Sequence, residues 1–202
     1  MTATSRPSRR AFTLIELLVV MTIITVLAGI TIGVMGNVQK KAATSRASVE
    51  IAAIETALER YKIDNGDYPV ANGIAITSNL YSSNPSNATY TTSGRTLFTA
   101  LMGRSAYSAT ANATAYIELK EGQVGSLTTN SYIQDPFGYA YGYFYDSAGN
   151  VNSVASAKSL FNQVVPDIWS TAGETGAVTV TNDGSANYAR YLRWVTNWGS
   201  RQ

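Results

Sequence analysis

The chain has 202 residues, of which 45% are hydrophobic and 14% are charged, and it contains neither cysteine nor histidine. The lack of cysteine excludes a disulfide scaffold, an iron–sulfur cluster and a thiolate zinc site. The lack of histidine removes the usual general base, the Ser-His-Asp triad and the commonest metal ligand. Composition therefore disfavours most hydrolytic and redox enzymes.

The formal net charge of +2 is unevenly distributed. Arg6, Arg9 and Arg10 precede residue 12 without any acidic residue, and removing them leaves 12 basic residues against 13 acidic ones. A duplex-binding protein normally carries a basic stripe that displaces counterions from phosphates. Because the remaining net charge is −1, we expect no nucleic acid among the partners.

An apolar stretch, residues 12–35, follows the arginines and contains one charged residue, Glu16. At 1.5 Å per residue it would form roughly 36 Å of helix, enough to cross a hydrocarbon layer of about 30 Å. The preceding arginines favour a cytoplasmic N-terminus, although Lys40 and Lys41 weaken that bias. Hydropathy alone leaves an uncleaved signal anchor open as an interpretation.

The cleavage signal stands before the apolar stretch. A secretory signal peptide would have a small-residue cleavage site after its apolar part, and residues 33–43 contain no convincing one. Here a small residue, Ala11, ends the basic leader. Cleavage after Ala11 would keep the apolar helix and make Phe12 the new N-terminus.

Glu16 needs a partner, because a carboxylate at membrane depth costs about 2.5–3.5 kcal/mol and residues 11–39 hold no other charge. A free amine at Phe12 would lie one helical turn away, and the helix dipole favours an acid in the first turn. The same carboxylate could pair with the Phe12 amine of a neighbouring subunit. A hydrated Glu16 at the membrane interface is the alternative.

Residues 9–17, Arg-Arg-Ala-Phe-Thr-Leu-Ile-Glu-Leu, closely resemble the cleavage and methylation motif of type IV pilins and type II secretion pseudopilins. The resemblance implies that a prepilin peptidase cuts between Ala11 and Phe12 and methylates the new amine. It also implies that Glu16 pairs with a neighbour's N-terminus during assembly. Ala11 stands where the family usually has glycine.

Three glycines, Gly29, Gly33 and Gly36, lie near the end of the apolar stretch. A Gly-x-x-x-Gly pair permits close approach of helices, and each glycine weakens a helix by about 1 kcal/mol against alanine. Many members of the family have proline hereabouts and partly unwind in the filament, which makes Gly33 a candidate hinge. Small residues without a special role are the alternative.

The helix is expected to continue to residue 65, because apolar residues recur at helical spacing beyond residue 46. Gly66 and Pro69 supply the stop. One helix over 12–65 would be about 80 Å long, with its second half packed on a sheet. The apolar stripe comprises Ala47, Ile51, Ile54, Leu58 and Tyr61.

The C-terminal part is predicted to form a small domain. Residues 70–131 are rich in Ser, Thr and Asn, and we expect irregular surface structure there with a short helix at 96–102. Asp-Pro-Phe-Gly at 135–138 predicts a turn, and an aromatic strand follows at 139–145 with a turn at 147–150. Further strands are expected at 163–170 and 177–181.

The aromatic residues of this strand are interpreted as core or cross-strand pairs rather than as a ligand platform. They are Tyr139, Tyr141, Tyr143, Phe144 and Tyr145. Residues 57–69 resemble the helix end of the major pseudopilins of type II secretion. The 135–138 turn, the aromatic strand and residues 167–170 and 195–198 resemble their C-terminal sheet.

A loop near the end of the sheet often binds calcium in that family, and calcium takes six to eight oxygen ligands. Glu174 falls near the family's acidic position, and Asp183 is the second candidate ligand. The usual Gly-Pro-Asp-Gly pattern is replaced by Thr-Ala-Gly-Glu-Thr-Gly at 171–176. Solvated turn residues are the alternative.

The resemblance implies an α+β type IV pilin fold in four segments: a cleaved leader (1–11), a membrane helix (12–35), an amphipathic half of that helix (36–66) and a globular domain (67–202) with an insertion at 70–131. It implies a structural subunit, not an enzyme, of a periplasmic pseudopilus for type II secretion, held in the inner membrane before assembly. The implied partners are copies of itself, prepilin peptidase, the inner-membrane assembly platform and minor pseudopilins.

Two other functions are left open. One is a type IV pilin of a surface filament for adhesion, motility or DNA uptake, although most such pilins carry a disulfide loop that a chain without cysteine lacks. The other is a signal-anchored periplasmic enzyme or binding protein, for which the sequence offers no site.

Overall fold

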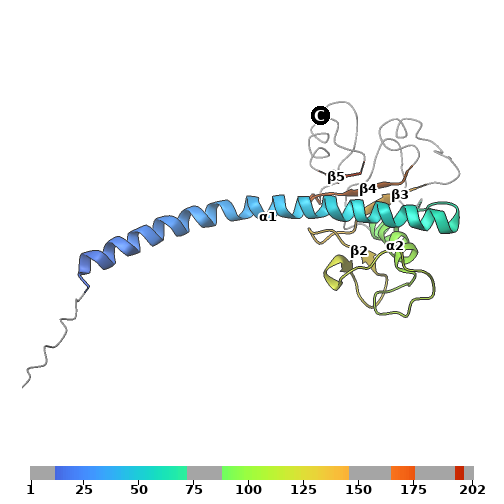
Figure 1. Ribbon diagram of the computed structural model, residues 1–202, viewed down its shortest axis with the longest axis horizontal. Helices are drawn as coiled ribbons and strands as arrows, with labels where there is room; N and C mark the ends of the chain where they lie inside the picture. The colour runs from blue at the N-terminus through green and yellow to red at the C-terminus, as the bar shows by residue number, and fades with distance from the viewer. Residues whose placement is uncertain (1–11, 72–87, 146–164, 176–193, 198–202) are drawn as a thin grey trace, which may run out of the picture. The chain divides into compact units, whose positions relative to one another are not determined.

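The computed structural model describes residues 12–71, 88–145, 165–175 and 194–197. The chain forms two compact units, Met1–Lys41 and Ala42–Gln202. Helix α1 (Leu14–Asn65) is continuous through 52 residues and contributes to both units (Figure 1). It ends where predicted: Gly66 has a φ of +86°, and its N–H donates to the carbonyl of Lys62 at 2.8 Å. Glycine is favoured there because it has no Cβ to clash at positive φ.

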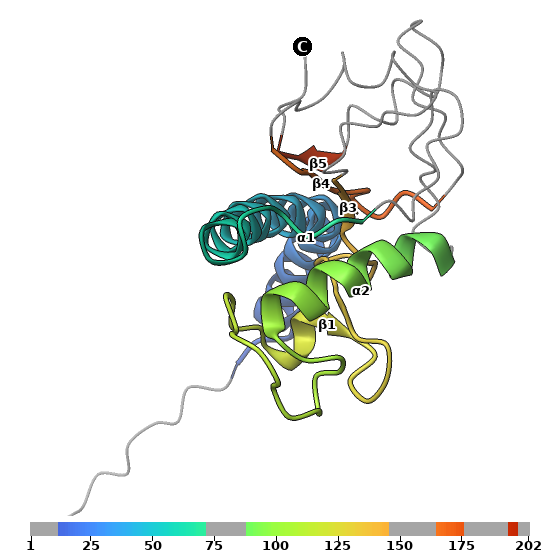
Figure 2. The same cartoon turned by 90° about the vertical axis from the view of Figure 1, so that its right-hand side faces the viewer.

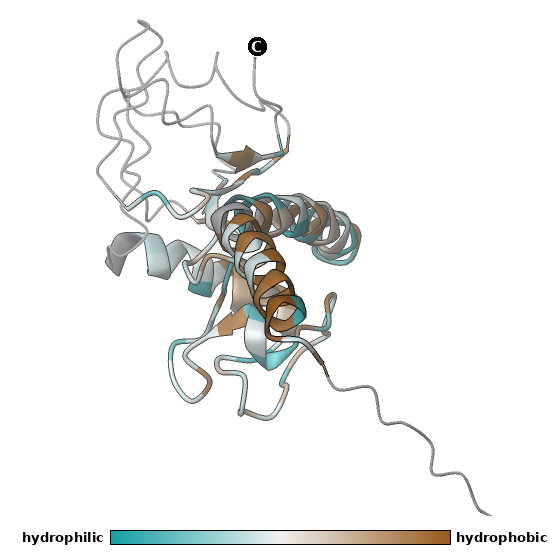
Figure 3. Cartoon of the chain, turned by 90° about the vertical axis from the view of Figure 1, so that its left-hand side faces the viewer, coloured by the Kyte–Doolittle hydropathy of each residue, from teal (hydrophilic) through white to brown (hydrophobic). Residues whose placement is uncertain are grey.

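The part of α1 in the first unit is apolar and exposed. Leu14 is 82% exposed and Ile32 is 75% exposed, and the ribbon of this part is coloured mostly as hydrophobic (Figure 3). Its most apolar window has a mean hydropathy of 2.6, and none of that window is buried. By length and composition, α1 is therefore able to cross a membrane.

Within the described residues, the second unit has five short strands in two antiparallel sheets. One sheet pairs β1 with β2, and the other has the order β3-β4-β5. The α1 residues of this unit run between the three-stranded sheet and helix α2 (Figure 1, Figure 2). The bounds are α2 Ala88–Met102, β1 Val124–Gly125, β2 Tyr132–Ile133, β3 Gly142–Phe144, β4 Asp167–Ser170 and β5 Val195–Thr196.

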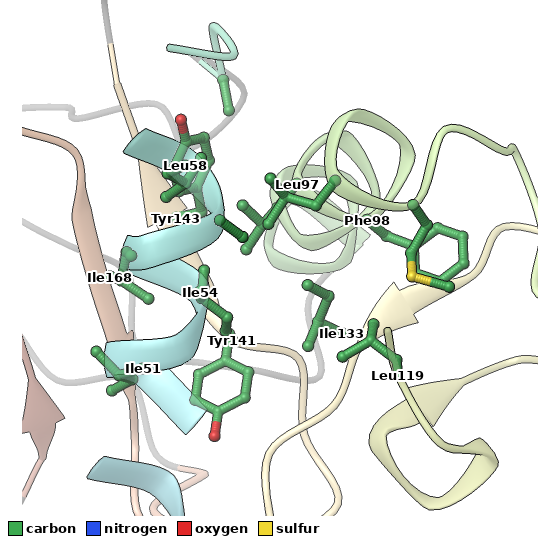
Figure 4. Packing of buried hydrophobic residues seen from close by; sticks show 14 of the residues in the cluster. Ile51, Ile54, Leu58, Leu97, Phe98, Leu119, Ile133, Tyr141, Tyr143 and Ile168 are labelled. Carbon is green, nitrogen blue, oxygen red and sulfur yellow. The ribbon is translucent and has the colours of Figure 1, made fainter. Parts of the chain in front are cut away.

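The core lies where α1, α2 and the strands meet (Figure 4). The predicted α1 stripe is confirmed: Ala47, Ile51, Ile54 and Leu58 are at most 3% exposed, and Tyr61 packs against the cluster. The predicted α+β class, with a long N-terminal helix and a small antiparallel sheet as in the type IV pilin fold, is confirmed. The core is completed by Leu97, Phe98, Leu101, Ile133, Tyr141, Tyr143 and Ile168.

The predicted short helix at 96–102 lies within α2, whereas the prediction of irregular surface structure is wrong for the first part of that helix, residues 88–95. This helix is 15 residues long, begins well before residue 96, and buries Leu97, Phe98 and Leu101 completely. One turn before Leu97, α2 faces the core with small residues. The Ser93 hydroxyl there donates to the carbonyl of Tyr143 at 2.6 Å. A Cβ on Gly94 would lie 3.3 Å from that of Ala140. Because this first part packs through Ser and Gly, apolar periodicity does not reveal it.

The predicted turn at 135–138 is confirmed, because the Gly138 N–H donates to the carbonyl of Asp135 at 3.0 Å. The aromatic strand is shorter than predicted: β3 has three residues, with isolated bridges at Ala140 and Tyr145. Tyr141 and Tyr143 are fully buried, which confirms their interpretation as core. β4 falls within the predicted 163–170, whereas the expected turn at 147–150 and strand at 177–181 lie outside the described residues.

Gly142 is paired with Trp169 across β3 and β4 and lies beneath its indole ring. A Cβ at Gly142 would lie 2.1 Å from Cε2 of Trp169, which is fully buried. Trp169 is held on its other sides by the edge-on ring of Tyr90 and the stacked ring of Trp194. The indole therefore has little room to move.

We predict that Gly142→Ala lowers the free energy of unfolding by about 1–3 kcal/mol through overpacking. Urea unfolding of the full chain in detergent, followed by tryptophan fluorescence, measures the change. The matched control is Gly122→Ala, where a Cβ meets nothing within 4 Å and the expected change is within about 0.5 kcal/mol. Equal unfolding midpoints for the two variants would contradict the packing argument.

Candidate functional site

The N-terminal end of α1 is closed by two side chains that cap each other. The Glu16 N–H donates to Oγ1 of Thr13 at 3.3 Å, while the Thr13 N–H donates to Oε2 of Glu16 at 2.9 Å. The Thr13 hydroxyl donates to the same Oε2 at 2.8 Å. This reciprocal arrangement is a capping box, which satisfies donors that a helix start leaves unpaired. The Glu16 carboxylate thus has partners within its own helix in the uncleaved chain.

Thr13 is the residue that the sequence analysis missed. Its signal was present, because Thr-x-x-Glu at 13–16 is the sequence pattern of a capping box. Phe12 is exposed, and Ala11 lies outside the described residues. Cleavage between Ala11 and Phe12, methylation of Phe12 and pairing of Glu16 between subunits all stay predictions.

The three glycines of the apolar stretch lie inside α1. A Cβ at Gly29 or at Gly36 would meet nothing within 4 Å. α1 is helical through all three positions, including Gly33. A role for Gly33 as a hinge stays a prediction.

Further along α1, Glu50 ties the helix to the residues that directly precede β1 and β3. Its Oε2 accepts the hydroxyl of Tyr141 at 2.7 Å. Its Oε1 accepts the side-chain amide of Gln123 at 3.1 Å and the guanidinium of Arg46 at 3.4 Å. Glu50 is only 14% exposed, so these donors replace the water that its charge has lost.

Glu55 connects α1 to Asn197, near the C-terminus. Its Oε1 accepts the side-chain amide of Asn197 at 3.0 Å. Asn197 exchanges two hydrogen bonds with Ile168 of β4, at 3.1 and 3.2 Å, and its side chain also donates to the carbonyl of Pro166 at 2.8 Å. Asn197 belongs to the segment predicted from its resemblance to the closing residues of pseudopilins, whereas Trp198 lies outside the described residues.

Two tyrosine–carboxylate pairs fix the far end of α1. The Tyr68 hydroxyl donates to Oε1 of Glu59 at 2.5 Å, and the Tyr145 hydroxyl donates to Oδ1 of Asp67 at 2.6 Å. Burial, and then the Glu59 carboxylate, raise the pKa of Tyr68. The Tyr145 hydroxyl lowers the pKa of Asp67. These groups are arranged to hold the helix, since each carboxylate is engaged by a donor of the domain.

Among the residues that the structure describes, Asp135 is the most buried carboxylate, at 2% exposure. It accepts the Ser170 hydroxyl at 2.5 Å and the N–H groups of Phe137 and Tyr139 at 3.0 and 2.8 Å. Burial raises its pKa, although these hydrogen bonds oppose the shift. Asp135 thereby fastens the 135–138 turn to the end of β4.

The predicted calcium ligands are only partly described. Glu174 lies in a turn in which its N–H donates to the carbonyl of Thr171 at 3.0 Å, and Asp183 lies outside the described residues. Across the described part of the chain, no three acidic, histidine or cysteine side chains gather in the way a metal site requires. Calcium binding stays a prediction.

Replacing Tyr141 tests how strongly Glu50 holds α1. Burial, and then the hydrogen bond to Glu50, raise the pKa of Tyr141 above its ordinary 10.0. The unfolded state therefore loses the Tyr141 proton first, so the stability from this group is complete below about pH 10 and is lost as pH rises further. We predict that Tyr141→Phe costs about 1.5–3 kcal/mol at neutral pH.

The variant should also lose less stability above pH 10 than the parent chain, measured by urea unfolding over a series of pH values. Tyr61→Phe is the matched control, because the Tyr61 hydroxyl has no hydrogen bond within the described residues. Identical pH profiles for the parent chain and Tyr141→Phe would show that Tyr141 does not carry the alkaline loss.

Comparison with known proteins finds similarity in the first half of the chain. Residues 6–32 match the family described as "Prokaryotic N-terminal methylation motif", and residues 34–97 match "Type II secretion system (T2SS), protein G". The chain is similar to proteins named "Type II secretion system core protein G" from Escherichia coli K12, at 46% identity over 65 residues, and Vibrio cholerae serotype O1, at 42% over 59 residues.

These alignments cover 32% and 29% of this chain, and the chain spans 44% and 40% of the length of the two relatives. No solved structure matches the chain. The resemblance predicted from residues 9–17 and 57–69 is confirmed. Residues 6–32 and 34–97 are thus similar to an N-terminal methylation motif and to type II secretion system protein G, respectively.

Proposed function

We propose that the chain is a structural subunit of the pseudopilus of a type II secretion system, and that it is the major pseudopilin. The observation that carries this proposal is a lone carboxylate, Glu16, at the start of an exposed apolar helix and within a match to an N-terminal methylation motif. The protein G segment and the small α+β unit that follow support it.

The proposed life of the subunit begins in the inner membrane, with the apolar part of α1 across the bilayer and the second unit in the periplasm. Prepilin peptidase then removes residues 1–11 and methylates Phe12. The assembly platform moves the subunit into a helical filament with further copies and minor pseudopilins. Head-to-tail contacts that do not close into a ring produce such a filament.

The capping box indicates how the Glu16 carboxylate could be compensated both in the membrane-held subunit and in the filament. Both donors from Thr13 end on Oε2 of Glu16. Oε1 is thus left to accept the Phe12 amine of a neighbouring subunit, while the cap of its own helix stays intact. Pairing would compensate the charge in surroundings where a lone carboxylate is costly.

The carboxylates Glu50, Glu55 and Glu59 would then carry mechanical load. Extraction pulls on α1, and its residues 42–65 are tied to the rest of the second unit by tyrosine and asparagine side chains. Hydrogen bonds to a charged acceptor are about twice as strong as neutral ones. They suit a helix that must pull its domain along.

The mass of the N-terminal peptide from the native host tests the proposal. A chain that starts at Phe12 and carries one additional methyl group is the expected result. A chain that still carries residues 6–11 would refute processing by prepilin peptidase and favour a plain signal anchor.

We predict that Glu16→Ala lowers the yield of filaments by at least about tenfold, because the neighbouring amine loses its counter-charge. Membrane insertion of the variant should be unimpaired, since the change removes a charge from the apolar stretch. The yield is measured as the amount of subunit in sheared filaments relative to the amount of subunit in the membrane fraction. The matched variant Thr13→Val removes the capping hydroxyl and keeps the carboxylate, so its filament yield should fall less. An unchanged yield in Glu16→Ala would contradict the pairing.

A further inference from the structure

The charges along α1 are separated by sign. Between Glu16 and Glu50 there is no acidic residue, and the charged residues in that interval are Lys40, Lys41 and Arg46. Arg46 is engaged with Glu50 at 3.4 Å. Lys40 and Lys41, here called the basic pair, are both exposed and lie at the C-terminal end of the first unit.

Their position is fixed by the helix. The basic pair follows residue 35, the end of the apolar stretch, by five and six residues on an uninterrupted α1. At 1.5 Å per residue this places the two Cα atoms roughly 7–9 Å beyond the apolar stretch. The polar layer on each side of a bilayer is about 5–8 Å thick. Long lysine stems adjust the ammonium groups to the depth of the lipid phosphates.

We infer that the basic pair binds the headgroups of anionic phospholipids on the face of the membrane from which the second unit emerges. Adjacent helix positions point about 100° apart, so the two ammonium groups reach different lipids. Each basic residue near an anionic surface strengthens binding about fivefold. The inference depends on the proposed function only in that α1 must span the membrane.

A lipid is favoured over an acidic protein partner. Within the described residues of the first unit, Glu16 is the one acidic residue, and it lies at the opposite end of the apolar stretch. Lipid headgroups surround every spanning helix at the depth of the basic pair. Anionic lipid would thus fix the depth of α1 in the membrane and oppose its extraction into the filament.

The experiment uses the full chain in bilayers of phosphatidylcholine with a minority of phosphatidylglycerol. Spin-labelled lipids report the preference of the protein boundary for phosphatidylglycerol over phosphatidylcholine. The test variant is Lys40→Gln with Lys41→Gln. The control is Arg95→Gln with Lys120→Gln, which removes the same charge from exposed residues of the second unit. Resistance to alkaline extraction is measured in parallel to establish that each protein is inserted.

The parent chain and the control should prefer phosphatidylglycerol several-fold, and the preference should weaken with salt. The basic-pair variant should lose most of that preference while it stays inserted. An inserted variant with the preference of the parent chain would overturn the inference alone. Chemical cross-linking between copies of the chain is measured as well. A basic-pair variant that keeps the preference for phosphatidylglycerol but loses this cross-linking would also overturn the inference, because the lysines would then face a second chain. A parent chain that fails to insert would refute the proposed function instead.

Discussion

The carboxylate of Glu16 constrains everything at the start of the chain, because it is the one charge within 24 apolar or small residues. An isolated carboxylate is costly in lipid, so donors must accompany it. Thr13 supplies two, through its N–H and its hydroxyl, and so also completes the first turn of α1. Thr13, which caps the start of the helix, therefore compensates the charge of Glu16 until the amine of a neighbouring subunit would bind it. This dual use explains why a short polar residue stands between Phe12 and the apolar run.

The second half of α1 also carries partly buried carboxylates, Glu50 and Glu55, which accept hydrogen bonds from distant parts of the chain. Its apolar stripe packs in the core with residues of α2 and the strands, and its carboxylates accept hydrogen bonds from hydroxyl and amide groups of residues outside those elements. Burial of hydrophobic area holds the helix without specifying its rotation or register. Directional hydrogen bonds to Glu50 and Glu55 add that specification. Replacing one donor, as in Tyr141→Phe, would leave the stripe in place while weakening the register.

The parts of the fold that could be predicted are those that repeat a period or a turn pattern. The α1 stripe, its glycine stop and the Asp135–Gly138 turn follow from local rules. Only residues 96–102 of helix α2 were predicted, because its first part faces the core with Ser93 and Gly94, whose burial depends on how closely β2 and β3 approach. Gln123 and Tyr141, two of the donors to Glu50, are 73 and 91 residues away from it in sequence. No local pattern reveals contacts of that range.

The separation of charge along α1 has a consequence for assembly. Moving the helix from bilayer to filament exchanges lipid neighbours for protein ones, so each charged group contributes the difference between its two partners. In the proposed exchange, Glu16 gains an amine that the bilayer does not supply, whereas Lys40 and Lys41 give up headgroup phosphates. These two changes oppose each other at the two ends of the same apolar stretch. The balance of assembly would then depend on membrane composition as well as on the subunit, since anionic lipid acts on one end only. A filament subunit with this charge pattern would leave a membrane poor in anionic lipid more readily than one rich in it.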